Sequence, residues 1–244
     1  MSRTAVITGA ATGIGRDTAK RFAAEGWNVA VHYNRSEAAA QSLVEELKAR
    51  HASTIKVQAD VRDPYAVKAM AEKVCRAFTR IDALVNNAGI AQQKLFTDIS
   101  ARDWDDMFDV NVKGVFHCCQ AVLPGMISRK SGCIVNVSSM WGEAGASCEV
   151  HYSAAKAAVI GLTKALAKEV GPSGVRVNCV TPGVIATAMT ANLDEDAIAA
   201  LKEETPLGVI GSPRYVADAI YYLASDRAAF VTGQVLGVSG GFVI

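Results

Sequence analysis

Short apolar runs alternate with longer segments of helical periodicity along the whole chain. The first run, Thr4-Ala5-Val6-Ile7-Thr8, is rich in β-branched residues and is typical of a buried strand. Seven such runs predict strands at 4–8, 28–33, 54–59, 81–86, 132–138, 175–180 and 234–238. Between them, apolar positions three and four residues apart predict helices at 14–25, 36–49, 64–79, 102–127, 152–170 and 213–225.

This alternation predicts an α/β fold with a doubly wound parallel sheet of seven strands. We find no linker, low-complexity tract or repeat, so we expect a single domain that spans residues 1–244. In folds of this kind, ligands bind beyond the carboxyl ends of the strands. Residues that carry chemistry are therefore expected just after predicted strands or at the starts of helices.

A glycine-rich loop follows the first predicted strand. Gly9, Gly13 and Gly15, with Thr12 and Ile14 among them, lead directly into the first predicted helix. Glycine permits a tight turn and the close approach of a diphosphate, whose charge is stabilised at a helix N-terminus. The spacing is G-x-x-x-G-x-G, and its place between a strand and a helix favours dinucleotide binding over a purely structural turn.

Tyr152 and Lys156 lie four residues apart in a predicted helix, so their side chains share one face. A free tyrosine has a pKa near ~10 and is a poor acid or base at neutral pH. A cation ~4 Å away contributes about 4 kcal/mol at an effective dielectric of ~20. We therefore expect Lys156 to lower the pKa of Tyr152 by roughly three units, which would suit it for proton transfer.

Composition and charge exclude several classes of protein. The net charge of +1 argues against a nucleic-acid binder, and no apolar run reaches the ~18 residues that span a bilayer. The six cysteines form no C-x-x-C pair and the four histidines are scattered, so we expect reduced thiols and no metal site. Because the first strand starts at Thr4, we expect no signal peptide and a cytoplasmic protein.

Five motifs, taken in order, resemble those of the short-chain dehydrogenase/reductase family. They are Thr8-Gly9-(x)3-Gly13-Ile14-Gly15, Asn86-Asn87-Ala88-Gly89, Ser139, Tyr152-(x)3-Lys156 and Pro182-Gly183, and they span nearly the whole chain. The resemblance implies a Rossmann-type fold and an NAD(P)-dependent oxidoreductase that interconverts a ketone and an alcohol.

The resemblance also implies a role for each matching residue of the reaction site. Tyr152 is the proton donor in reduction and the base in oxidation, and Lys156 lowers its pKa and binds the nicotinamide ribose. Ser139 polarises the carbonyl, and we prefer it to Ser138 because it stands thirteen residues before the tyrosine. Asn111, inside a predicted helix, holds a relay water for proton supply.

The end of the second predicted strand bears on the choice of cofactor. An NAD site usually places an acidic residue there, but none occurs before Glu37. Arg35 and Ser36, next to Asn34, can instead bind a 2′-phosphate, which favours NADP(H) over NAD(H). The alternative is a solvated turn, and Thr12 stands where some NADP-dependent members of the family carry a basic residue.

By resemblance, Asp60 contacts the adenine, and Thr187 contacts the phosphate or amide end of the cofactor. The full set of expected cofactor contacts is Gly9, Thr12, Gly13, Ile14, Gly15, Asn34, Arg35, Ser36, Asp60, Val61, Asn87, Ala88, Gly89, Tyr152, Lys156, Pro182, Gly183, Ile185 and Thr187.

The segment between Ser139 and Tyr152 lines the substrate pocket in this family. Its length and pattern resemble those of reductases that act on 3-oxoacyl groups carried by acyl carrier protein. Those enzymes dock the acidic carrier on basic residues beside the site. Arg129 and Lys130 fall where one of these is expected, whereas Ser173 stands at the second position.

The same segment resembles a branch that reduces a 5-aminopentanone group on elongation factor P. For that substrate, Glu143 and Glu149 would attract the terminal cation and Trp141 would add a cation–π contact. With Ser139 these are the expected substrate contacts; the alternative is that both glutamates are solvated loop charges. Residues 32–36 resemble pteridine reductases, which rank third.

The loop from Ile185 to Leu207, with Met189, Asn192 and Leu193, is expected to form a mobile lid. A regulator that binds NADP without chemistry is disfavoured because all four catalytic positions are filled. By resemblance, the helices at 102–127 and 152–170 pair between subunits, and the apolar end at 242–244 lies near a second interface. We therefore expect a homotetramer.

Overall fold

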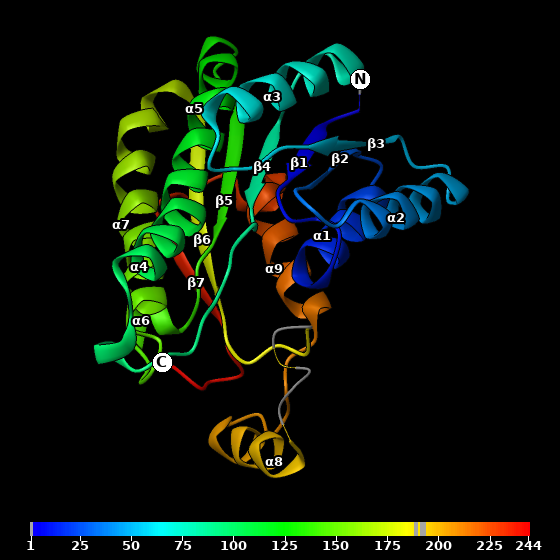
Figure 1. Cartoon of the computed structure of the whole chain (residues 1–244). Coiled ribbons are helices and arrows are strands. Elements are labelled where there is room, and N and C mark those ends of the chain that lie inside the picture. Colours follow the sequence, from blue (N-terminus) through cyan, green and yellow to red (C-terminus); the bar gives the residue numbers. More distant parts are fainter. Residues whose placement is uncertain (1, 188–189, 191–193) are drawn as a thin grey trace.

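The computed structural model describes residues 2–187, 190 and 194–244. Within these residues, one parallel sheet of seven strands runs through the molecule, in the order β3-β2-β1-β4-β5-β6-β7 (Figure 1). The strands are β1 (Thr4–Ile7), β2 (Asn28–Tyr33), β3 (Thr54–Gln58), β4 (Ala83–Asn86), β5 (Gly132–Val137), β6 (Val175–Pro182) and β7 (Val235–Val238). The predicted α/β fold with a doubly wound parallel sheet is confirmed.

Apolar side chains on both faces of the sheet explain why these segments form buried strands. Along β1, Ala5 and Ile7 pack into one core, and Val6 between them packs into the core on the other face. Helices close both cores. Phe22, Leu43 and Ile220 come from α1, α2 and α9 on one face, and α3, α5 and α7 cover the other face.

The helices that pack on the sheet begin and end within two residues of the predicted positions, with one interruption. The helices are α1 (Gly13–Ala24), α2 (Glu37–Ala49), α3 (Pro64–Phe78), α4 (Ala101–Phe108), α5 (Gly114–Ser128), α6 (Trp141–Ala144), α7 (Val150–Val170), α8 (Glu195–Glu204) and α9 (Pro213–Ala224). Short 3₁₀ turns are η1 (Phe96–Asp98), η3 (Gly171–Ser173) and η4 (Asp226–Ala228).

The helix predicted at 102–127 is not continuous. A π-helical turn, η2 (Asp109–Lys113), separates α4 from α5. Asn111 lies in the middle of this turn, and its amide donates to the carbonyl of Met107, one turn back, and to that of Ile90. A π turn inserts one residue into a helix and often marks a functional site.

The predicted loop from Ile185 to Leu207 is wrong in part, because it contains the helix α8. The Asp194 carboxylate accepts the Ala197 N–H at 2.8 Å, and two acidic residues follow in the first turn, which stabilises the helix start. Ile185, at the start of the segment, pairs in an isolated bridge with Gly211, four residues beyond its end. Met189, Asn192 and Leu193 lie outside the described residues.

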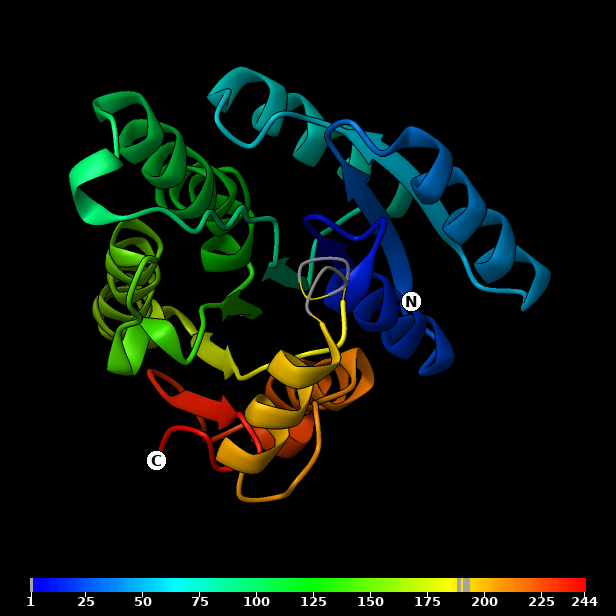
Figure 2. The ribbon, with the colours of Figure 1, turned by 60° about the horizontal axis from the view of Figure 1, so that its bottom comes forward.

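The topology sets where a ligand can bind. Strand β1 pairs on one side with β2 and on the other with β4, so the order of the strands along the chain reverses there. A crevice beyond the carboxyl ends of the strands opens at such a point. Figure 2 turns the lower end of Figure 1 forward, where α6, α8 and the C-terminus lie.

Candidate active site

The glycine loop after β1 has the geometry of a phosphate cradle. Gly9 and Gly13 adopt positive φ angles of 62° and 54°, which disfavour any residue with a side chain. A Cβ at Gly15 would lie 2.3 Å from the carbonyl oxygen of Gly9. The loop ends at the N-terminus of α1, whose first turn has no acidic residue. These residues therefore fit an anionic diphosphate group.

His32, in β2, fixes the glycine loop, and the sequence did not reveal this role. Its ring is fully buried, with Nδ1 accepting the Gly9 N–H at 3.0 Å and Nε2 lying 3.0 Å from the carbonyl oxygen of Ala59. Because a carbonyl only accepts, Nε2 carries the proton. Burial lowers the pKa of His32 to about 4, so the ring is neutral at pH 7.

Thr8 and Asn87 tie the glycine loop to the end of β4. The Thr8 hydroxyl accepts the backbone N–H groups of Asn87 and Ala88 at 2.9 and 3.0 Å. In return, the Asn87 amide donates to the carbonyls of Thr8 and Gly9. The motif Asn86–Gly89 thus lies against the loop, as its position after a predicted strand indicated. Thr8 had been quoted as part of the motif but not as a site residue.

At the far end of the crevice, Asn34, Arg35 and Ser36 are exposed just after β2. Asp60, after β3, binds the guanidinium of Arg62, with its nearest oxygen 2.7 Å from an Arg62 nitrogen. This contact with Arg62 lowers the pKa of Asp60, which is therefore ionised at neutral pH. The next residue, Val61, is buried. The contact of Asp60 with an adenine remains a prediction.

The four predicted catalytic residues lie near one another. Tyr152 and Lys156 are in the first two turns of α7, and the ammonium of Lys156 lies 5.6 Å from the centre of the Tyr152 ring. Lys156 donates to the carbonyl of Val137 at 3.0 Å. A Cβ at Gly89 would lie 2.6 Å from Oδ1 of Asn111 and 3.4 Å from Nζ of Lys156. Asn111 and Lys156 therefore meet beside Gly89, and Asn111 is fully buried.

The two candidate serines have different surroundings. The Ser138 hydroxyl donates to the carbonyl of Lys156 at 2.7 Å, so it is engaged with the backbone of α7. Ser139 lies close enough to Tyr152 to lower the pKa of its phenol, and the Ser139 hydroxyl accepts the N–H of Trp141. This geometry agrees with the choice of Ser139 from its spacing.

The expected effect of Lys156 on Tyr152 is wrong for this structure. Burial raises the pKa of Tyr152 to about 12. The nearby Ser139 hydroxyl acts in the opposite direction and lowers the pKa, whereas the charge of Glu149 raises it. Burial also lowers the pKa of Lys156 to about 8. The spacing placed the ammonium beside the ring as expected, but removal of the phenolate from water has the larger effect.

The three predicted substrate contacts other than Ser139 separate into two places. Glu149 is half-buried beside Tyr152, and its carboxylate accepts from the side-chain amide of Gln93 at 3.2 Å. Trp141 packs edge-on against Phe242, with ring centres 5.6 Å apart. Glu143 is exposed and lines a hollow of about 700 Å³ between the segment after β6 and the end of the chain. Glu149, three residues before Tyr152, is thus the glutamate whose charge acts on the phenol and raises its pKa.

The residues after β6 close the side of the crevice. Gly183 donates to the carbonyl of Val238, and a Cβ at this position would lie 2.6 Å from the Cα of Ser239. Pro182 accepts the N–H of Met140 at 3.0 Å, and Ile185 is buried. The side chain of Thr187 lies over the glycine loop, 3.4 Å from where a Cβ at Gly13 would stand. Of these predicted contacts, Thr187 therefore borders the phosphate cradle.

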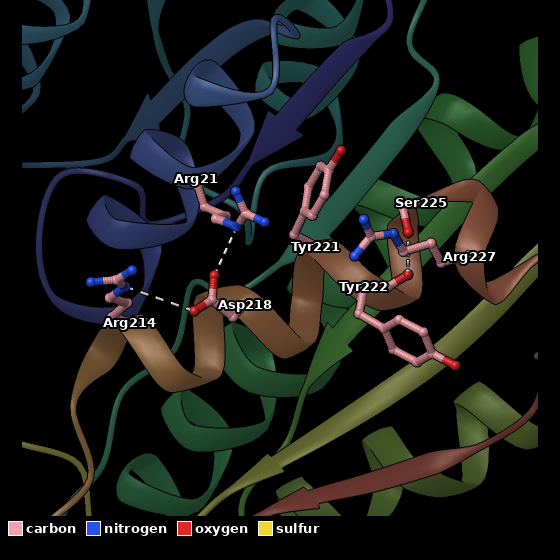
Figure 3. Close-up of a pocket in the computed structure, with 7 residues that line it drawn as sticks. All are labelled: Arg21, Arg214, Asp218, Tyr221, Tyr222, Ser225 and Arg227. Carbon is pink, nitrogen blue, oxygen red and sulfur yellow. Dashed lines mark hydrogen bonds and ion pairs between the residues drawn. The ribbon is translucent and has the colours of Figure 1, made fainter.

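A second hollow, of about 380 Å³, lies on the outer side of α9 (Figure 3). Asp218 forms ion pairs with Arg21 at 2.7 Å and with Arg214 at 3.8 Å, and Arg21 also lies over the Tyr221 ring. Asp218 is therefore already paired with both arginines. None of the predicted site residues lines this hollow, so we place the chemistry at the sheet edge.

All six cysteines are free thiols, and four of them are buried. Over the described residues, no group of three or more His, Cys, Asp or Glu side chains is placed to bind a metal ion. Within the same residues, no helix combines the length and apolar character needed to cross a membrane.

Comparison with known proteins gives matches over nearly the whole chain. A family profile described as enoyl-(acyl carrier protein) reductase matches residues 9–243. The chain is 42% identical over 241 residues to the 3-oxoacyl-[acyl-carrier-protein] reductase FabG of Staphylococcus aureus, covering 99% of this chain and 98% of that protein. It is 44% identical over 239 residues to FabG of Thermotoga maritima, with coverage of 98% and 97%. For the reductase of the same name from Synechocystis, the identity is 43% over 244 residues, with coverage of 100% and 98%.

Proposed function

This chain belongs to the short-chain dehydrogenase/reductase family, whose members are oxidoreductases that act on C=O and CH–OH groups. On this basis we propose that it is an NADPH-dependent 3-oxoacyl-[acyl-carrier-protein] reductase. The observation that carries the proposal is 42–44% identity to reductases of that name over the full length of the chain. The site supports it, because Ser139, Tyr152 and Lys156 lie together beside the crevice that the glycine loop borders.

The family uses a nicotinamide cofactor, and bound NADPH would supply the hydride for the carbonyl carbon. The glycine loop, with the N-terminus of α1, would bind its diphosphate. Further along the crevice, Gly89 lets the backbone pass close to Asn111 and Lys156, because a side chain there would meet both. Gly9 and Gly13 adopt their positive φ angles without strain, so the loop can turn tightly where the diphosphate would lie.

Tyr152 would donate the proton to the carbonyl oxygen, and Ser139 would donate a hydrogen bond to the same oxygen. With a pKa of about 12, the phenol keeps its proton at neutral pH. An alkoxide is a much stronger base, comparable with hydroxide, whose conjugate acid has a pKa of about 15.7. Proton transfer from the phenol to the forming alkoxide is therefore downhill, which suits Tyr152 to act as the proton donor in reduction.

Lys156 and Asn111 would complete the site. Lys156 is fixed by Val137 and lies close enough to Asn111 for one polar path to lead inward from Tyr152. The Asn111 amide is held by Ile90 and Met107, so its orientation is set before substrate binds. A fixed donor and acceptor at this depth suits the relay of a proton to the tyrosine.

The preference for NADPH rests on charge at the end of β2. Arg35 is exposed and can reach a 2′-phosphate, and Ser36 stands beside it at the start of α2. The first acidic residue, Glu37, is paired with Lys56 at 2.8 Å and so is engaged away from a ribose. This arrangement supports a phosphate-bearing cofactor.

Docking of the carrier on Arg129 and Lys130 is not supported within one chain. The Arg129 guanidinium donates to the carbonyl of Ile81 at 2.6 Å, at the start of β4 and the opposite end of the sheet from Tyr152. The carrier-bound substrate is therefore proposed from the relatives and not from these two basic residues.

We further propose a cytoplasmic homotetramer. Phe116 on α5 is 46% exposed, and Ile244 at the chain end is fully exposed. Helix α5 and the C-terminus therefore each offer apolar surface to another copy of the chain. Light scattering measures the state directly, and a monomer would contradict this assignment.

One observation favours a second candidate substrate. Glu149 lies beside Tyr152, where its carboxylate can attract a cation. This position suits the amino-ketone of the 5-aminopentanone group on elongation factor P. Replacing Glu149 with Gln would then raise KM for an amino-ketone but not for a neutral one, whereas equal effects on both would exclude the role.

Turnover on the two substrate classes tests the proposed function. Purified protein is assayed for NADPH oxidation with acetoacetyl-acyl-carrier-protein and with a small amino-ketone, and NADH is run in parallel. We expect fast turnover of the carrier-bound substrate with NADPH. Turnover confined to the amino-ketone would reject the 3-oxoacyl assignment in favour of the second candidate.

A further inference from the structure

The start of α7, which carries Tyr152, lacks a cap of its own. Glu149 stands at the N-cap position, but its side chain makes no hydrogen bond to the first turn. The first N–H groups of a helix have no partner inside the helix, and helix ends fray when nothing replaces a cap. Tyr152 is the third residue of this helix, so fraying would move its phenol.

The segment after β4 supplies the missing support. Three consecutive residues in that segment, 92–94, form hydrogen bonds with three of the four residues 148–151. The Lys94 N–H donates to the carbonyl of Cys148 at 2.7 Å. The side-chain amide of Gln93 donates to Glu149 at 3.2 Å, and Gln92 lies 3.0 Å from Nε2 of His151.

Asp103, in the first turn of α4, anchors this segment. Its carboxylate accepts from the Gln92 amide at 3.1 Å, from the Lys94 ammonium at 2.7 Å and from the Ser100 hydroxyl at 2.6 Å. The hydrogen bonds from Lys94 and then Ser100 hold the pKa of Asp103 well below its usual range. The anchor is therefore an ionised acceptor at any pH at which the enzyme would work.

The anchor fixes the direction of each hydrogen bond. A carboxylate only accepts, so the Gln92 NH₂ group points to Asp103 and its oxygen points to His151. His151 must then donate from Nε2. Its Nδ1 is buried without a hydrogen-bond partner among the described residues. Burying an unpaired polar atom is unfavourable, so fold stability alone does not explain a histidine here.

We propose that Gln92, Gln93 and Lys94, bound to Cys148, Glu149 and His151 and anchored on Asp103, form a clasp that keeps Tyr152 in its proton-donating position. Gln92, Asp103 and His151 are then positioning residues, because they act through the tyrosine and do not touch the reacting atoms. This inference rests on the role of Tyr152 given under the proposed function.

A double-mutant cycle tests the clasp. Gln92→Leu removes the link to Asp103, and His151→Phe removes the donor from the other side. A displacement of about 1 Å in a catalytic group can lower a rate about 100-fold. We expect each single variant to lower kcat about 10- to 100-fold, with the Kd for NADPH within about threefold of wild type. The kcat of the double variant should be no lower than that of the slower single variant, because both substitutions remove the same contact.

Two further variants separate positioning from general damage. His151→Gln retains an N–H near the position of Nε2 and is expected to recover most of kcat. Gln41→Leu is the matched control, since Gln41 is a half-buried glutamine far from the site that donates to Glu45 on α2. It should leave kcat unchanged. A His151→Gln variant as slow as His151→Phe would overturn the clasp.

Hydrogen exchange over residues 146–156 gives a readout that does not need substrate. Exchange should be faster in Gln92→Leu and His151→Phe than in wild type and the Gln41→Leu control. Unchanged exchange there, or kcat losses that multiply in the double variant, would contradict the clasp. Failure of wild-type turnover on acetoacetyl-acyl-carrier-protein would instead contradict the proposed substrate, and the exchange result would still decide the clasp.

Discussion

Mild acid should weaken this protein through the buried ring of His32. In the folded state the ring accepts from Gly9 and donates to Ala59, and burial lowers its pKa to about 4. In the unfolded chain the pKa returns to its ordinary value of about 6.5. The unfolded state therefore binds the proton more readily. The stability that comes from the neutral ring is complete above pH 6.5 and is lost as the pH falls towards 4.

The size of the effect follows from the two pKa values. A difference of roughly 2.5 units at ~1.36 kcal/mol per unit amounts to about 3 kcal/mol over the whole window. About 2 kcal/mol of this is lost between pH 7 and pH 5. No allowance for solvent screening is needed, because only 1% of the residue is exposed. For a domain with a typical stability of about 5–15 kcal/mol, this loss is readily measured.

The assay compares wild type with His32→Asn at one fixed protein concentration. The Asn Oδ1 occupies the position of the imidazole Nδ1, so it can accept the Gly9 N–H, but it does not titrate. The other three histidines are common to both proteins, so their effects cancel. The free energies of unfolding in urea at pH 7, 6 and 5 should converge by about 2 kcal/mol. Parallel pH dependence in the two proteins would refute the reasoning.

Three further predictions concern the cofactor and the proton. Gly15→Ala should raise the Kd for NADPH more than tenfold in a fluorescence titration, because its Cβ would clash with the Gly9 carbonyl, whereas Gly161→Ala, in open space, should not. Arg35→Ala should weaken NADPH about tenfold, as loss of one charge-assisted contact of ~1.4 kcal/mol implies, and should leave NADH nearly unchanged. Alcohol oxidation should speed up about tenfold per pH unit from pH 6 to 8, since the fraction of Tyr152 that has lost its proton rises by that factor below a pKa of about 12. A flat oxidation profile would show that another group accepts the proton.

The strands and most helices could be predicted from the sequence because local patterns determine them. Both faces of β1 are buried, so its apolar run is unbroken, and the glycines after it mark its end. Helix α8 was also within reach, since Asp194 and the acidic residues after it form an N-terminal signal. The π turn at Asn111 was not, because it depends on a carbonyl of Ile90 that is distant in sequence.

The pKa values and hydrogen bonds of the site were harder to predict than which residues form it. The spacing brought Tyr152 and Lys156 together, but the pKa of the phenol depends on how much water is removed from it, which spacing does not describe. The role of His32 depends on contacts with Gly9 and Ala59, which lie on two other loops. Charges and hydrogen bonds that join distant segments therefore need the structure, whereas motif residues along the sheet edge do not.

Proton donation by Tyr152 is the central claim, and one comparison tests it most directly. We would measure kcat for NADPH oxidation with acetoacetyl-acyl-carrier-protein in wild type and in Tyr152→Phe, together with the Kd for NADPH in both. The account predicts a loss of about 10²–10⁴-fold in kcat, the usual contribution of a positioned acid, with NADPH still bound. Equal turnover by the two proteins would contradict the account.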